Sequence, residues 1–239
     1  MREVATSTRL RLLDGFEVEN VAHRAVVPGG ARRLVAFLGV YGRTTRAEIA
    51  YTLWPGASEA QARGNLRTVL WRLNRLRPAL VTAASDLLML HRDVRVDLAE
   101  FLDTARGVLA LDGGLGDGQA VLTALTTAGE LLPGWYEDWV LRERERLRQI
   151  RLHALEVLAT WFANGDRYSE AIEAALAAVR LDPLRESAVR TLITVHVAEH
   201  NAAEAVRAYD SFRDVLDTEL GVAPSRELRE LMARMVASH

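Results

Sequence analysis

The sequence predicts a mainly α fold with a small β component, in which a mixed domain over residues 1–98 precedes an all-α domain over residues 99–239. Strand and helix patterns alternate up to about residue 96, and only helical patterns follow. The charge divides at the same place. Residues 1–99 carry 15 Arg against 9 acids, whereas residues 100–239 carry 15 Arg against 23 acids. A basic domain followed by an acidic one indicates two domains with different partners.

The overall composition excludes several classes of protein. The chain has 239 residues and 49% hydrophobic residues, which indicates a globular rather than a disordered protein. It contains no apolar run of 18 residues and no N-terminal stretch like a signal peptide, so we expect no membrane contact and a cytoplasmic location. It has no cysteine, which excludes disulfides and thiolate metal sites.

The first elements are predicted to be strands. Residues 10–19 partly alternate around Asp14-Gly15, which supplies the positive φ of a tight hairpin. Val26-Val27 is a candidate third strand, and Pro28-Gly29-Gly30 is a break before the first helix.

Three helices and a hairpin are predicted next. Apolar residues at helical spacing over residues 34–41 indicate a helix ended by Gly42. Thr44-Thr45 caps a second helix, Arg46–Leu53, which Trp54-Pro55-Gly56 ends, and Ser58 caps a third that runs to about Leu76, before Pro78. The segments 80–82 and 87–90 flank the tip Ala83–Asp86 and predict a closing hairpin.

A 34-residue repeat characterises the acidic half. Leu158 and Ala171 recur as Leu192 and Ala205, although the next pair, Val179 and Arg213, does not match. Tyr168 and Ala171 stand where a tetratricopeptide unit places its Tyr and small Ala, and Asp182-Pro183 ends the unit. Because one helix–turn–helix unit cannot bury its apolar face alone, we expect a short α-solenoid that offers a binding groove rather than an active site.

Two breaks precede the repeat. The glycines of residues 113–118 lack the preceding strand and the following Lys-Ser/Thr of a phosphate-binding loop, and therefore indicate a surface loop. A second break at residues 131–135 precedes a highly charged helix, Glu137–Leu152.

The third helix is amphipathic and rich in arginine. On a helical wheel its leucines and Val69 cluster on one side. The opposite side and its margins carry the candidate DNA-binding residues Arg63, Arg67, Thr68, Trp71, Arg72 and Arg75. Residues 60–77 contain five arginines and no acid, so their charges repel one another and favour an external anion such as the phosphate backbone. Arginine can also bind guanine, and Thr68 can reach a base edge.

Two alternatives remain at this helix. It could be an ordinary exposed helix whose arginines pair with acids elsewhere in the fold. Trp71 could contact DNA or fold back on its own domain. Arg32 and Arg33, just before the first helix, either touch the DNA backbone or lie in a solvated loop.

Enzyme motifs are weak or absent. His196-Val-Ala-Glu-His200 matches the H-x-x-E-H zinc pattern, but it lies at a helix end within a repeat and no further ligand is evident. Glu143 and Glu145 alternate with arginines, which is typical of a solvated ion-pair surface rather than a catalytic pair. We therefore expect no enzyme activity, no cofactor and no metal.

Five segments resemble a known family. Residues 10–18, Leu53-Trp-Pro and Ala62–Leu76 are similar to the winged helix-turn-helix of the SARP-type regulators, in the OmpR/PhoB class. Residues 131–147 and 209–225 resemble the start and end of the bacterial transcriptional activation domain, a tetratricopeptide-like α-solenoid that follows it in that family. The resemblance covers nearly the whole chain.

The resemblance implies a transcriptional activator. Its members bind direct repeats near promoters as a side-by-side pair and recruit RNA polymerase, so double-stranded DNA, RNA polymerase and a second copy on DNA are the expected partners. The chain departs from the family in two places. Asn74 replaces a common basic residue, and the wing tip Ala83–Asp86 has no positive charge.

A second interpretation comes from the absence of positive charge at the wing tip. A helical-repeat adaptor or co-regulator whose winged helix has lost specific DNA binding would have the same domain order. Salt-dependent binding to promoter fragments separates the two interpretations.

Overall fold

The computed structural model describes residues 8–20, 23–24, 27–76, 79–110 and 115–237. Its contacts divide the chain into two compact units: unit 1 comprises residues 1–102 and 128–144, and unit 2 comprises residues 103–127 and 145–239. Residues 128–144 therefore pack with the N-terminal unit, although the sequence prediction assigned them to the second domain. The division into domains at residues 98 and 99 stays a prediction. Each unit is described by itself.

A four-stranded sheet forms one part of unit 1. Its order is β3-β2-β1-β7, with β1 and β7 parallel and the other pairs antiparallel. The strands are β1 (Thr8–Arg11), β2 (Glu17–Asn20), β3 (His23–Arg24) and β7 (Val94–Val96). The predicted hairpin is confirmed, and Asp14 and Gly15 have φ of 67° and 147°.

The third strand differs from its prediction. It is His23–Arg24, and the pair Val26-Val27 is not the strand. Val26 lies outside the described residues, and Val27 is buried against unit 1 instead, with 2% of its surface exposed. The burial of Val27 outside any strand explains why an apolar residue here did not indicate a strand.

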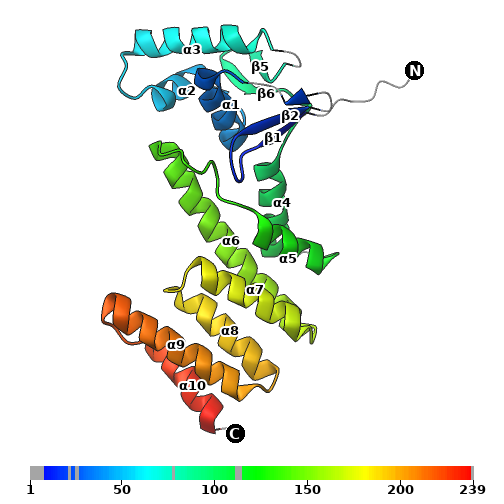
Figure 1. Cartoon of the computed structure of the whole chain (residues 1–239), viewed down its shortest axis with the longest axis vertical. Coiled ribbons are helices and arrows are strands. Elements are labelled where there is room, and N and C mark those ends of the chain that lie inside the picture. Colours follow the sequence, from blue (N-terminus) through cyan, green and yellow to red (C-terminus); the bar gives the residue numbers. More distant parts are fainter. Residues whose placement is uncertain (1–7, 21–22, 25–26, 77–78, 111–114, 238–239) are drawn as a thin grey trace, which may run out of the picture. The chain divides into compact units, whose positions relative to one another are not determined.

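Three helices form the body of unit 1 (Figure 1). They are α1 (Gly29–Tyr41), α2 (Arg46–Leu53) and α3 (Glu59–Leu73). Gly42, with φ of 69°, ends α1, and Thr45 caps α2 by accepting a hydrogen bond from the Glu48 N–H, as predicted. The first helix begins at Gly29, so Gly29-Gly30 is its first turn and not a break before it.

The predicted closing hairpin is present and belongs to a second sheet of order β4-β6-β5. Its strands are β4 (Thr44–Thr45), β5 (Val81–Ala84) and β6 (Leu87–Leu90). Ala84 pairs with Leu87, so the hairpin tip is Ser85-Asp86 and is shorter than predicted. The sequence did not predict β4 or β7, because strands of two or three residues are too short to show alternation.

Residues 128–144 attach to unit 1 through a bridge and aromatic contacts. Leu13 forms an isolated antiparallel bridge with Leu131, and the rings of Phe37 and Trp139 lie 5.4 Å apart, edge to face. The Arg144 guanidinium donates hydrogen bonds to the carbonyl oxygens of Leu131, Leu132 and Trp135. The turn at residues 131–135 is thereby held to the first half of α6.

Unit 2 is helical throughout the residues described. Its elements are the C-terminal part of α4 (Asp97–Ala110), α5 (Gly118–Thr127), most of α6 (Asp138–Asn164), α7 (Tyr168–Leu181), α8 (Glu186–Ala198), α9 (Ala202–Leu220) and α10 (Arg226–Ala237). The charged helix predicted to end at Leu152 continues to Asn164. The surface loop predicted at residues 113–118 lies partly outside the described residues, and Gly118 begins α5.

The 34-residue repeat matches buried positions. Leu158, Ala171, Leu192 and Ala205 have between 0% and 5% of their surface exposed. Successive helices α7, α8 and α9 pack against each other, and α10 packs on α8 and α9 (Figure 1). The last helices enclose a cluster that includes Ile193, Phe212 and Met232. Stacked helix pairs that share a continuous core are what a short α-solenoid requires.

One carboxylate joins two elements of unit 1. Asp97, the first residue of α4, accepts hydrogen bonds from the backbone N–H groups of Leu12, Leu13 and Leu98. Burial raises the pKa of the Asp97 carboxyl, and the three N–H groups and Arg9 oppose that rise. The side chain therefore satisfies the end of β1 and the N-terminus of α4 together.

We predict that Asp97→Ala lowers the free energy of unfolding by about 2–4 kcal/mol, because it leaves three backbone donors without their charged acceptor. Chemical denaturation measures the change. Asp103→Ala in the same helix is the matched control, since its exposed ion pair with Arg106 contributes at most about 1 kcal/mol. Equal losses in the two variants would contradict the role assigned to Asp97.

Candidate DNA-binding surface

The position of α3 is set by its cap and its buried face. Ser58 and Gln61 form a capping box, in which each side chain accepts a hydrogen bond from the other residue's backbone N–H. Ala62, Leu66, Val69 and Leu73 are buried where α3 packs on α1 and α2. This is the apolar side that the helical wheel predicted, with Leu70 half-buried at its margin.

The opposite side of α3 is exposed. All six residues predicted to bind DNA have exposed side chains: Arg63, Arg67, Thr68, Trp71, Arg72 and Arg75. Trp71 has 60% of its surface exposed, so it does not fold back into the core of unit 1. Five of the six lie on α3 itself. Whether these residues bind DNA is not tested by their placement.

The helix ends before its predicted end. It stops at Leu73, with Asn74 as its C-cap, and Arg75 lies in the turn that follows. Pro78, on which the predicted end rested, lies outside the described residues. The Asn74 N–H still bonds the Leu70 carbonyl, four residues back, whereas the N–H groups of Arg75 and Leu76 bond carbonyls three residues back, as in a 3₁₀ turn.

The arginines of this face differ in their partners. Arg63 forms an ion pair of 2.6 Å with Glu59, one turn earlier. Glu59 lies one residue outside the acid-free range considered in the sequence, so one of the five charges is already paired. Within the described residues Arg67, Arg72 and Arg75 form no ion pair. Three unneutralised guanidinium groups on one face are an electrostatic site for anions.

Two side-chain contacts order this surface further. The Thr68 hydroxyl donates to the Gly64 carbonyl at 3.1 Å, which leaves its oxygen free to accept and its methyl group outward. The Arg75 guanidinium lies over the Trp71 ring, 4.5 Å from its centroid. Such stacking restricts the guanidinium before any ligand binds.

Arg32 and Arg33 take structural roles in unit 1. Both lie in α1, not before it. Arg32 donates to the Val27 carbonyl at 3.2 Å, and Arg33 Nε lies 3.0 Å from Glu137 Oε1. The solvated-loop interpretation is wrong for both, because both belong to α1; a DNA-backbone contact by the exposed Arg32 stays a prediction.

The wing is short and carries no basic residue at its tip. Residues 82–86 are exposed, and the tip itself is Ser85-Asp86. The Asp86 carbonyl accepts a hydrogen bond from the Arg46 N–H at 2.9 Å, which fixes the backbone of the tip against the start of α2. The acidic side chain of Asp86 is therefore held at the surface.

Sequence reasoning missed one polar residue on α3. Asn65 is exposed at the margin of the buried face, two turns before Arg72 and one turn after Gln61. Its amide can donate to and accept from adenine in the major groove. Its position on the polar side of the helical wheel was the signal that would have identified it.

The H-x-x-E-H segment is built differently from a metal site. His196 has 8% of its surface exposed, and its Nδ1 lies 3.8 Å from Glu199 Oε2. In the part of the chain described, no group of three or more His, Cys, Asp or Glu side chains could hold a metal ion.

Among the described helices, none is both long enough and apolar enough to cross a membrane.

Comparisons with known proteins identify the second half of the chain. The family model of the bacterial transcriptional activator domain matches residues 96–235. The regulatory protein AfsR of Streptomyces griseus is 28% identical over 221 residues, and that of Streptomyces coelicolor is 29% identical over 211 residues. Each match covers 85% of this chain, but only 22% and 21% of the relatives, so the chain spans about a fifth of their length.

A solved structure has the same fold. The structure of Mycobacterium tuberculosis EmbR in complex with a low-affinity phosphopeptide is 20% identical and superposes with a TM-score of 0.76. The match covers 98% of this chain and 66% of that one. It supports an N-terminal winged helix-turn-helix followed by a tetratricopeptide-like helical domain.

The family match covers more than half of the chain, and the two relatives extend the likeness into the winged helix-turn-helix. The chain therefore belongs to the SARP-type transcriptional regulators, in which an OmpR/PhoB-like winged helix precedes a bacterial transcriptional activator domain.

Proposed function

We propose that this DNA-binding regulator is a sequence-specific activator that places α3 in the major groove of direct repeats near promoters. The single observation that supports this assignment is the exposed face of α3, where Arg67, Arg72 and Arg75 have no ion pair within the described residues. Phosphate supplies the missing negative charge, and base edges supply acceptors for guanidinium groups. Thr68 adds a short hydrogen-bonding side chain to the same face, and Asn65 adds another at its margin on the side of Arg72.

The helical unit has a separate role in the proposal. We assign it to protein contacts, with RNA polymerase and with a second copy of the chain on DNA. The acidic charge of residues 100–239 disfavours a phosphate contact there, and stacked helices present grooves rather than catalytic clusters. The activator domain of the family supports the polymerase assignment.

Footprinting on genomic fragments, repeated at several salt concentrations, tests this function. We predict a specific footprint for the full chain and a loss of about 1–3 kcal/mol in binding for Arg67→Ala, which removes an unpaired charge. If Arg67 contacts a phosphate, the slope of log affinity against log salt also falls by about one.

Arg180→Ala is the matched control, because Arg180 is an exposed arginine in α7 of unit 2. Its affinity and its salt slope should equal those of the unchanged chain. An equal effect of the two substitutions would show that general positive charge, and not the α3 surface, binds DNA.

The Trp71–Arg75 pair generates a second prediction. Because the guanidinium is stacked 4.5 Å from the ring centroid, Trp71→Ala releases Arg75 as well as removing the indole. A double-mutant cycle of Trp71→Ala and Arg75→Ala, measured by DNA affinity, should give a coupling energy of about 0.5–1 kcal/mol. Strictly additive losses would mean that the two side chains act on DNA independently.

One observation favours a second function. The exposed wing tip Ser85-Asp86 offers DNA no positive charge, as expected for an adaptor or co-regulator whose specific binding has weakened. Absence of any footprint above non-specific binding would favour this function. Transcription by purified polymerase from a bound promoter would favour the activator.

Asp86→Arg tests the wing directly. If α3 occupies the major groove and the wing approaches the backbone, this change replaces repulsion of phosphate by attraction. We predict higher affinity and a salt slope steeper by up to about one. Ser169→Arg, at an exposed position of α7, is the control for added charge and should leave both quantities unchanged. An unchanged affinity of Asp86→Arg would place the wing away from DNA.

A further inference from the structure

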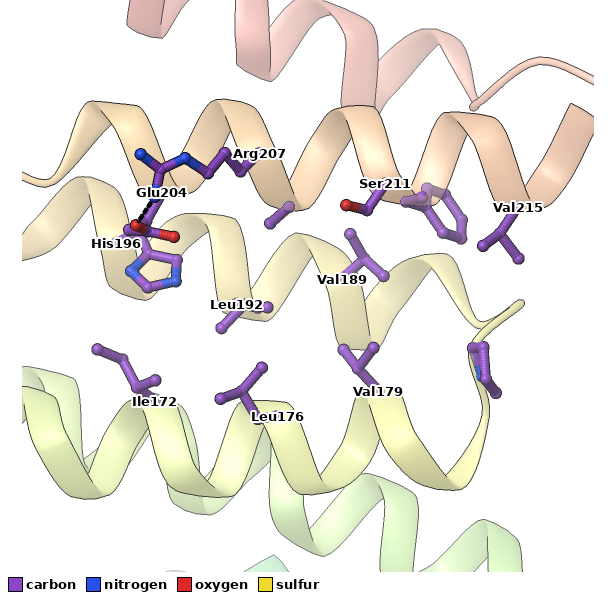
Figure 2. A pocket seen from close by; sticks show the side chains of 13 residues that line it. Ile172, Leu176, Val179, Val189, Leu192, His196, Glu204, Arg207, Ser211 and Val215 are labelled. Carbon is purple, nitrogen blue, oxygen red and sulfur yellow. Dashed lines mark hydrogen bonds and ion pairs between the residues drawn. The ribbon is translucent and has the colours of Figure 1, made fainter.

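A groove runs along α7, α8 and α9 in unit 2 (Figure 2). It encloses about 470 Å³ and follows α9 from Glu204 to Val215, a length of about 17 Å at the helical rise. Most of its lining is aliphatic, with Ile172, Leu176 and Val179 on one side and Leu192 on its floor. Leu176 keeps 38% of its surface exposed although it faces this groove.

Polar groups gather at one end of the groove. His196 of α8 lies there beside Glu204 and Arg207 of α9, which form an ion pair with each other (Figure 2). The other end, at Val179 and Val215, has no charged side chain among the lining residues. The groove is therefore mostly apolar, with Ser211 as the polar residue along its length and hydrogen-bonding groups gathered at one end.

His196 is the unusual member of this end. It has 8% of its surface exposed, yet its buried Nδ1 has no hydrogen-bond partner among the described residues. The charged neighbour of Nδ1 is Glu199 Oε2 at 3.8 Å, which is an acceptor. In the neutral ring this neighbour favours the proton on Nδ1, so Nε2 presents a lone pair. Figure 2 shows the ring turned from α8 into the groove.

The size and polarity of the groove favour a small molecule over a peptide. Ligand pockets of about 300–1,000 Å³ with mostly apolar walls and few polar groups are typical of small organic ligands. An extended peptide would bring a backbone N–H and C=O at every residue, and the aliphatic part of the groove offers them no partners. One apolar body with one polar end matches the lining better.

We propose that the α7–α9 groove binds a small organic molecule with an apolar body and a hydroxyl or N–H donor at one end. The body lies along Leu176, Val179 and Leu192, and the donor bonds His196 Nε2. His196 marks the polar end because its ring is turned into the groove, and with the Nδ1 proton toward Glu199 its Nε2 lone pair can accept a hydrogen bond from a ligand donor. This site is separate from the proposed DNA surface, which belongs to unit 1.

Titration of the full chain with N-phenyl-1-naphthylamine, an uncharged fluorescent probe with one N–H, tests the site. We expect saturable binding of one probe per chain. Ser211→Phe and, independently, Leu176→Trp fill the groove from its two sides and should each weaken binding at least tenfold. Ser169→Phe, at an exposed position of α7 outside the groove, is the matched control and should bind as the unchanged chain does.

The polar end is tested with a second probe. The N-methyl derivative of the same probe has no donor and measures binding to the apolar body alone. His196→Leu should weaken binding of the N–H probe by about two- to twelvefold and leave the affinity for the N-methyl probe unchanged. Circular dichroism and the thermal midpoint of each variant establish that it is folded.

Three outcomes would overturn the proposal. The first is binding that does not saturate, and the second is equal binding by Ser211→Phe, Leu176→Trp and the unchanged chain. The third is an equal loss of affinity for both probes in a folded His196→Leu variant. That result would mean that His196 does not accept a hydrogen bond from the N–H probe. If the groove binds neither probe but binds an amphipathic helical peptide saturably, the groove is a site for a protein partner instead.

Discussion

The burial of one face of α3 is the constraint on which the proposed DNA surface depends. Leu66, Val69 and Leu73 must leave water, and α1 and α2 supply the apolar surface that receives them. Because side chains of a helix share a face at fixed spacing, burying these three turns Arg67 and Arg72 outward. The exposed charge on α3 therefore follows from which side chains of the helix the core buries, and the capping box at Ser58 fixes where the helix begins.

Charge is used differently in the two units. In unit 2, two arginines are neutralised by acids that reach them from other helices or turns: Arg148 bonds Asp182 as well as Glu145 of its own helix, and Arg185 bonds Glu156. The hydrogen bonds from Arg148 and Gln149 lower the pKa of Glu145 to about 2 and keep it ionised. On α3, three arginines have no such partner among the described residues. A surface attracts phosphate when the positive charge on one face is not neutralised by nearby acids, and the number of arginines alone does not decide this.

The helical unit presents the opposite kind of surface. Small residues of α7, among them Ala171, Ala174 and Ala178, are completely buried and let the helices approach closely. The larger aliphatic side chains then line a groove instead of filling it. A solenoid whose helices stack through small residues can keep an open apolar groove without losing its core, because core and groove use different faces.

The sequence by itself determined the elements with strong local signals. Three of these signals act between near neighbours in the chain: the 3.6-residue spacing of α3, the cap at Ser58 and the turn at Asp14-Gly15. The fourth is the 34-residue repeat, whose matching positions are visible in the sequence without knowledge of contacts. The change of pattern and of charge near residue 98 predicted the order of the two domains, and the resemblance to a family agreed with it. The exposed face of α3 was predictable for the same reason, since periodicity alone divides buried from exposed positions.

The tertiary structure alone decided what depends on distant residues. The short strands β4 and β7 exist because a neighbouring strand offers partners, and residues 128–144 pack with unit 1 through Trp139 and Leu131. Arg33 is neutralised by Glu137, a partner about a hundred residues away in the sequence. The groove beside His196 likewise needs three helices together. Such contacts form only when the chain brings separated residues together, so no local pattern records them.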